Sequence, residues 1–418
     1  MYTTEPECHA PREEHNRAST PIWGLLASTA TLYASFGLIY GLMQGGLPPL
    51  MRSRGIDLAT IGWAFLMLVP FGLTFLWAPI VDAFSPIRST PRIGWVSLMQ
   101  GLTISVLLLV ANGESFAPIT LLGLGLIVAF AAATMDVALD ALCAACVPAA
   151  HRTTAGGLKV ASLALGGIFG GGVFVAISEQ LGWSATFYLC AAVSAVATVP
   201  IILNRMWDRP AQGHEKERPR LVAIIRRREM RHRVMLLTFA TCSMVALAFF
   251  NRVMLVDQGV SIERIGWIVG TGAPICGLTA SLLTIPILRN LGSGLGVLLY
   301  AAICIGSAGT MVVGIWSMNP SLAIAGAIAM NAGTSGFFVI LSAATLGWAK
   351  GTQPATDYAA LYGASRLVAT VILIALANVV PRIGWPAFYL VACLALIITV
   401  ILLRNALPDL RKRHEKKY

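Results

Sequence analysis

Long apolar stretches recur along the whole chain, and short polar segments separate them. A helix that crosses a bilayer core of about 30 Å needs about 20 mainly apolar residues, because each residue advances it by about 1.5 Å. The residues are 57% hydrophobic and only 12% charged, whereas about 25% of the residues of a soluble domain are charged, so a water-soluble fold is excluded. The sequence therefore predicts an all-α polytopic membrane protein with about twelve transmembrane helices, at 22–46, 60–81, 93–111, 118–142, 155–177, 184–203, 234–256, 264–287, 294–316, 322–348, 358–380 and 386–403.

The basic residues are distributed unevenly over this map. Of the 30 Lys and Arg, 24 fall on the side that holds both termini, five fall on the opposite side, and Arg366 lies inside a span. Because cytoplasmic loops are enriched in Lys and Arg, both termini are predicted to be cytoplasmic. The net charge of +11 is thus explained by orientation in a lipid bilayer, and no nucleic-acid partner is expected.

One long polar segment divides the chain near its middle. The predicted organisation is a cytoplasmic tail at 1–21, a six-helix bundle at 22–203, a basic cytoplasmic linker at 204–233, a second bundle at 234–403, and a basic cytoplasmic tail at 404–418. Residues 1–20 lack the apolar core and cleavage site of a secretory signal, so the first apolar helix is expected to be retained.

The two bundles carry matching local sequence. Residues 55–63 read GIDLATIGW and residues 259–267 read GVSIERIGW, while residues 182–189 read GWSATFYL and residues 384–390 read GWPAFYL. Both matches have an offset of about 200 residues, which indicates a duplicated six-helix unit. Two parallel repeats with a solute site between them, near the middle of the membrane, are typical of alternating-access transporters.

Several motifs resemble the muropeptide-permease-like branch of the major facilitator superfamily. They are GLPPLMRSRG at 46–55, LWAPIVD at 76–82 and ATMDVALDA at 133–141. Within that branch the chain is most similar to single-component siderophore permeases of the rhizobactin and pyochelin type. This resemblance implies a monomeric permease of the bacterial inner membrane that imports a ferric siderophore from the periplasm by alternating access, driven by protons. The alternative is a permease for a muropeptide or another small amphiphile.

Two features depart from the superfamily pattern. Asp82 stands where the signature between the second and third spans has its aspartate, but Ala83 follows it, and basic residues return only at Arg88 and Arg92. These three polar residues are candidates for a gating or structural role. The fifth span has the glycine spacing of the antiporter signature without its proline, which disfavours antiport.

Acidic residues within a span are costly to insert and usually face a cavity or a partner. Asp136 and Asp140 lie four residues apart on one face of the fourth span. Burial beside a like charge favours the neutral form of a carboxylate, so both residues are candidates for proton coupling. The alternative is an ion pair with Lys159, or a hydrogen bond that fixes the fourth span to the fifth.

The basic residue inside a span is a candidate anion-binding group. Tyr358, Tyr362 and Arg366 recur every four residues and form one stripe, which suits a ligand with carboxylate or phenolate groups. The alternative is a structural salt bridge, or a side chain that extends to the membrane surface.

Two other spans offer polar or aromatic candidates for substrate binding. Tyr33, Tyr40 and Gln44 share one face of the first span, where they can stack on a ring-containing solute, although helix packing and an interfacial aromatic belt explain them equally well. Asn331 is a polar residue in the middle of the tenth span.

No pattern in the sequence favours an enzyme. A cluster with nucleophile and base is absent, and so is an ATP-binding signature. Cys143 and Cys146 form a lone CxxC motif inside an apolar helix, which is a weak metal signal, and all six histidines fall in predicted tails or loops. We therefore expect no metal and no cofactor, and a small-molecule solute as the partner.

Overall fold

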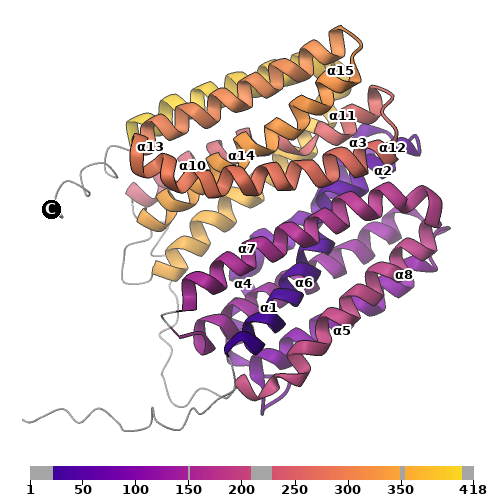
Figure 1. Ribbon diagram of the computed structural model, residues 1–418, viewed down its shortest axis with the longest axis vertical. Coiled ribbons are helices and arrows are strands. Elements are labelled where there is room, and N and C mark those ends of the chain that lie inside the picture. The colour runs from indigo at the N-terminus through magenta and orange to yellow at the C-terminus, as the bar shows by residue number, and fades with distance from the viewer. Residues whose placement is uncertain (1–21, 149–150, 209–227, 349–353, 407–418) are drawn as a thin grey trace, which may run out of the picture.

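The computed structural model describes residues 22–148, 151–208, 228–348 and 354–406. Within these ranges the chain is helical with short turns and contains no strand (Figure 1). Ten of the described helical segments are long and apolar enough to cross a membrane. The predicted fold class is confirmed as an all-α membrane bundle. Two predicted pairs of spans are joined in the segments Ala155–Leu203 and Leu361–Leu403, and a break at Gly182 or Gly384 separates the two spans of each pair.

The first half of the molecule contains the helices up to α8. In order they are α1 (Ile22–Gly41), the π-helix η2 (Leu42–Gly46), α2 (Leu47–Ser53), α3 (Leu58–Ala64), the 3-10 helix η3 (Phe65–Leu68), α4 (Val69–Ala83), α5 (Pro91–Ala111), α6 (Pro118–Cys146), α7 (Arg152–Ile168), the π-helix η5 (Phe169–Val173), α8 (Phe174–Leu203) and η6 (Arg205–Trp207). Proline opens α5 and α6, where its missing N–H has no helical partner to lose.

The second half contains the remaining helices. They are α10 (Arg228–Phe249), α11 (Asn251–Asp257), α12 (Ile262–Arg264), the π-helix η7 (Ile265–Val269), α13 (Gly270–Trp316), α14 (Pro320–Trp348) and α15 (Pro354–Ala406). The longest helices are not continuous rods. A glycine with φ of 78° interrupts α8 at Gly182, α13 at Gly292 and α15 at Gly384, and such a conformation strains any residue that carries a Cβ.

The repeated sequence takes the same local structure in both halves. Gly55 and Gly259 have φ angles of 80° and 76°. Two residues later, the side chains of Asp57 and Ser261 each cap the following helix by accepting a hydrogen bond from the backbone N–H three residues on. The matching conformations support the duplication that the sequence predicts.

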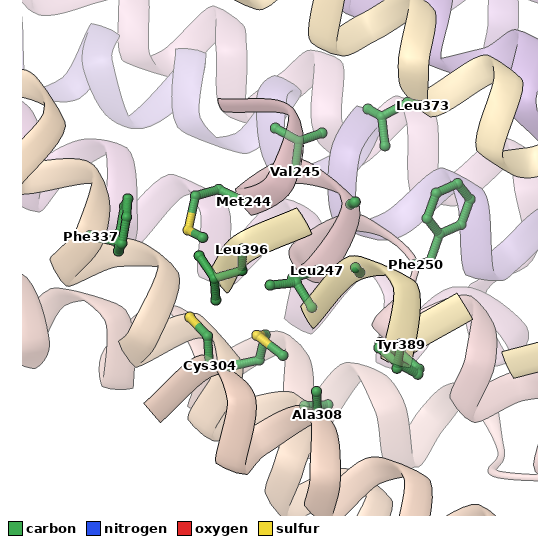
Figure 2. Packing of buried hydrophobic residues seen from close by; sticks show 14 of the residues in the cluster. Met244, Val245, Leu247, Phe250, Cys304, Ala308, Phe337, Leu373, Tyr389 and Leu396 are labelled. Atoms are coloured by element: carbon green, nitrogen blue, oxygen red, sulfur yellow. The ribbon is translucent and has the colours of Figure 1, made fainter. Parts of the chain in front are cut away.

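Each half has its own hydrophobic core. The first core is built from residues between Leu25 and Ile201, and the second mainly from residues between Met230 and Leu403. Figure 2 shows part of the second core, where Met244 and Val245 of α10, Cys304 of α13, Phe337 of α14 and Leu396 of α15 pack together. Leu58, Ile61 and Phe65 of the first half join this second core, so the halves are packed directly against each other there.

The halves are in contact at the end of the bundle that holds the short helices α2, α11 and α12, which we call the short-helix end. Figure 1 shows these helices gathered with α3 at one end of the molecule. Gly62 of α3 lies so close to α15 that an added Cβ would come within 2.6 Å of the Cβ of Ala377. Small residues thus permit close helix contact between the halves, as is common in membrane bundles.

Candidate functional site

A cavity of about 170 Å³ lies between the two halves. The first half contributes side chains from α1, η2, η3 and α4, and the second contributes side chains from α10, α14 and α15. The lining residues are Tyr40, Gln44, Leu68, Phe71, Thr241, Val245, Phe249, Phe338, Tyr362, Ser365, Arg366, Ala369, Thr370 and Leu373. Four of the predicted substrate contacts, Tyr40, Gln44, Tyr362 and Arg366, therefore come together in one cavity.

The second half supplies the cation of this cavity. The guanidinium carbon of Arg366 lies 5.1 Å from the centroid of the Tyr362 ring, one helical turn away on α15. At this distance the ring face attracts the cation and holds it in place. The neighbouring hydroxyls of Ser365 and Thr370 donate to backbone carbonyls of their own helix, at 2.9 Å each.

The first half supplies an aromatic wall. Tyr40 is stacked on Phe36 with ring centroids 6.0 Å apart, and Phe71 meets Tyr40 edge to face at 5.3 Å. The side-chain amide of Gln44 donates a long hydrogen bond of 3.5 Å to the Tyr40 hydroxyl. The cavity thus combines aromatic rings and an amide from the first half with a cation and further aromatic rings from the second half.

Three other predicted substrate contacts lie elsewhere. Tyr33 is buried in the first half, and its hydroxyl donates to Asp140 Oδ1 at 2.7 Å. Asn331 does not line the central cavity in the described part of the chain, and its Oδ1 accepts a hydrogen bond from Ser335 Oγ at 3.2 Å. Tyr358 belongs to α15, but its side chain lies outside the described residues.

Lys159 binds both acidic residues of the fourth predicted span. Its Nζ lies 3.0 Å from Asp136 Oδ1 and 2.6 Å from Asp140 Oδ1, and 4.8 Å from the centroid of the Tyr33 ring. The side chain of Asp136 is 28% exposed and that of Asp140 is 53% exposed. The ion pair that the sequence offers as the alternative to proton coupling is therefore formed. Asp136 also interacts electrostatically with Arg366 across the interface of the halves.

Arg92 has a structural contact within the first half. The backbone N–H groups of Arg92 and Ile93 donate to Asp208 Oδ2 at 2.6 and 2.7 Å, and Arg92 Nη1 lies 3.2 Å from Asp208 Oδ1. The fully buried Asp208 side chain thus satisfies N–H groups at the start of α5. Arg88 is exposed, and the side chain of Asp82 lies outside the described residues.

Arg252 is a contact between the halves that the sequence analysis assigned no role. Its Nη1, on α11 of the second half, donates to the carbonyl of Gly45 in η2 at 2.7 Å and also to the carbonyl of Gly171 in η5. Both acceptors lie in π-helical segments, which are frequent at functional sites. A Cβ on Gly45 would lie 2.5 Å from Arg252 Nη1, so a larger residue at this position would displace the guanidinium. The sequence gives little indication of this contact. It shows only glycine runs near two span ends and an arginine near a third.

The described residues contain no group of three His, Cys, Asp or Glu side chains that could hold a metal ion. Neither cysteine of the CxxC motif forms a disulfide within the described residues, and the Cys146 thiol donates to the carbonyl of Trp207 at 3.1 Å.

The family model for the Major Facilitator Superfamily matches residues 25–316, which is more than half of the chain. The chain belongs to the major facilitator superfamily. Solved transporter structures have a similar fold over nearly the whole chain. A POT family transporter in complex with 5-aminolevulinic acid has a TM-score of 0.72 at 13% identity and covers 93% of this chain and 96% of its own. The nucleoside transporter NupG has a TM-score of 0.66 at 14% identity, with 92% and 98% covered. At these identities the similarity shows the fold alone.

Curated relatives match a shorter segment. The anhydromuropeptide permease of Escherichia coli (strain K12) is 30% identical over 172 residues, which are 40% of this chain and 34% of the relative. The putative transporter AmpG 4 of Rickettsia felis is 29% identical over 158 residues, 36% of this chain and 38% of the relative. The chain therefore spans about a third of the length of the curated relatives it matches. These names support the predicted muropeptide-permease-like branch, whereas the narrower resemblance to siderophore permeases is not shown.

This chain is thus a multi-pass membrane protein of the superfamily.

Proposed function

We propose that this protein imports an anhydromuropeptide-like solute, an amino sugar joined to a short peptide, across the bacterial inner membrane by alternating access. The observation that supports this most is the cavity between the halves, which is lined by the cation of Arg366 and by the aromatic rings of Tyr40 and Phe71. The names of the relatives move the proposal from a ferric siderophore to a muropeptide.

The two faces of the cavity complement the two parts of such a solute. A planar guanidinium can bind a peptide carboxylate with two parallel hydrogen bonds, and it stays charged at every physiological pH. The apolar face of a sugar ring can pack on Tyr40 and Phe71, while the amide of Gln44 can bind a hydroxyl or acetamido group. A ferric siderophore also has rings and acidic oxygens, so it serves as the comparison solute in the experiment below.

The size of the cavity implies that it must widen to hold the solute. Pockets for drug-sized ligands have volumes of about 300–1,000 Å³, well above the 170 Å³ found here. A rocking movement of one half against the other would enlarge it. We propose that the short-helix end is periplasmic and both termini are cytoplasmic, because the basic residues concentrate on the side of the termini.

Asp136 remains our proposed proton carrier. It is paired with Lys159 in its own half and also interacts electrostatically with Arg366 in the other half. A movement of the halves that separates Asp136 from Arg366 would change the cost of its negative charge, and this would couple protonation to transport.

The test is uptake of radiolabelled anhydromuropeptide into proteoliposomes that contain only this protein, in either orientation in the vesicle membrane. We expect accumulation that depends on an imposed proton gradient and that unlabelled anhydromuropeptide inhibits. Accumulation of a ferric siderophore with no uptake of anhydromuropeptide would overturn the proposal.

A further inference from the structure

A groove on the second half, beside the central cavity, has the chemistry of a second binding subsite. We infer that this groove binds the uncharged, hydroxyl- and amide-bearing part of the solute while Arg366 binds its anionic part. The inference rests on the proposed function, and it adds that the protein selects solutes long enough to occupy both places.

The groove lies between α13 and α14 and has a volume of about 490 Å³. Its lining residues are Ser281, Ser335, Phe338, Val339, Ser342 and Ala343. Ser335 and Ser342 are seven residues apart on α14, so both present their hydroxyls on one face of that helix. Phe338 lines the groove and also the central cavity, so the two spaces adjoin at this side chain.

Two of the three hydroxyls of the groove, those of Ser281 and Ser342, differ from the threonine hydroxyls of the same helices. Thr279 and Thr284 of α13 and Thr345 of α14 each donate to a carbonyl four residues earlier, as is usual for hydroxyls within membrane helices. Ser281 and Ser342 have no hydrogen-bond partner within the described part of the chain, although both are partly buried. Hydroxyls without partners in a groove are available to a ligand, as donors and as acceptors.

The absence of charge defines what the groove can bind. None of its six lining residues is ionisable, so it offers nothing to neutralise a carboxylate. Serine hydroxyls suit sugar hydroxyls and acetamido groups, and Phe338 and Val339 offer apolar surface to the face of a ring. Within the proposed function, the peptide carboxylates would bind at Arg366 and the outer N-acetylated sugar would bind in the groove.

The test compares two solutes on one variant. The double variant Ser281→Ala/Ser342→Ala is assayed in proteoliposomes with an anhydromuropeptide that has its outer N-acetylglucosamine and with one that lacks it. We expect the KM for the longer solute to rise about tenfold, because two neutral hydrogen bonds are lost, and the KM for the shorter solute to stay within about twofold. The control Ser105→Ala/Ser317→Ala removes two exposed hydroxyls that bond to their own helices, and both KM values should be unchanged.

A second variant fills the groove rather than removing its hydroxyls. Ser342→Trp should block uptake of the longer solute and leave uptake of the shorter solute. Equal changes for the two solutes in both variants, or no change in either, would show that the groove is not a subsite. The proposed function would survive that result as long as Arg366→Ala impairs uptake of both solutes. Failure of the unaltered protein to transport either solute would instead remove the proposed function and this inference together.

Discussion

Arg52 on α2 and Asp257 on α11 form a salt bridge between the two halves, with Arg52 Nε 2.6 Å from Asp257 Oδ1. The other carboxylate oxygen of Asp257 accepts a hydrogen bond from the indole of Trp385 at 2.9 Å. Asp257 therefore ties α2 of the first half to α15 through a single side chain. Together with Arg252, it joins the two halves at the short-helix end, and we expect these contacts to break when the central cavity opens to that side.

Breaking the salt bridge should open the short-helix end more often. Asp257→Asn removes a half-buried charge pair, which contributes up to about 1 kcal/mol, so the open population should rise roughly two- to fivefold. A cysteine placed at Gln44 in a background without native cysteines should then react correspondingly faster with a membrane-impermeant thiol reagent added from the periplasmic side. Arg54→Ala is the matched control, because Arg54 lies over the ring of Trp183, 5.1 Å away within the same half. Equal labelling rates in the two variants would contradict the role of Asp257.

The close contact between Arg252 and Gly45 can be tested by replacing Gly45 with alanine, which adds a single methyl group. Gly45→Ala would place a Cβ 2.5 Å from Arg252 Nη1 and displace the guanidinium from the Gly45 carbonyl. We expect the transport rate to fall at least fivefold, because the stability of the closed short-helix end changes by about 1 kcal/mol or more. Gly101→Ala is the control, because an added Cβ there has no atom within 4 Å. A normal rate for Gly45→Ala would show that the contact is dispensable.

Removing the charge of Asp136 should abolish proton coupling and leave the movement of the solute across the membrane intact. We expect Asp136→Asn to abolish accumulation against a gradient while it retains exchange of labelled for unlabelled solute, since Lys159 keeps Asp140 as a partner. Both activities are measured in the same proteoliposomes. Normal proton-driven accumulation by this variant would move the carrier elsewhere, and Asp140→Asn would be tested next.

The geometry of Arg366, and not only its charge, should determine affinity. Arg366→Ala should raise the KM at least tenfold and Arg366→Lys less, because lysine keeps the charge without the forked donors. Tyr362→Phe and Tyr40→Ala should have milder effects of about 1 kcal/mol, or roughly fivefold. The KM is measured by initial uptake rates for each variant, after size-exclusion chromatography confirms that it is folded. An unchanged KM for Arg366→Ala would exclude Arg366 as the anion-binding group.

Asp208 should be important for stability rather than for transport chemistry. Asp208→Ala leaves two N–H groups at the start of α5 without their acceptor and Arg92 without its partner, which should destabilise the protein by about 2–4 kcal/mol. Thermal unfolding in detergent, followed by tryptophan fluorescence, should show a clearly lower midpoint. Glu263→Ala, at an exposed side chain near the start of α12, should leave the midpoint unchanged.

Part of the candidate site could be predicted because it is local in sequence. Tyr362 and Arg366 are four residues apart on one helix, so their contact follows from helical geometry alone. Which residues on the α1 stripe line the cavity could not be predicted in the same way. Tyr33 and Tyr40 are seven residues apart on one stripe, yet Tyr40 lines the cavity whereas Tyr33 bonds to Asp140 within the first half. A stripe runs the length of a helix, and neighbouring helices decide which part of it meets the cavity.

The sequence by itself determined the membrane fold, the approximate spans and the repeated turns at Gly55 and Gly259, because apolar length and glycine conformation are properties of short segments. Only the tertiary structure decided which charges meet. Lys159 lies 23 residues from Asp136, and Arg252 lies 207 residues from Gly45, so helix packing alone brings these groups together. In a bilayer, where water cannot satisfy buried polar groups, the partner that packing supplies fixes the role of each charge.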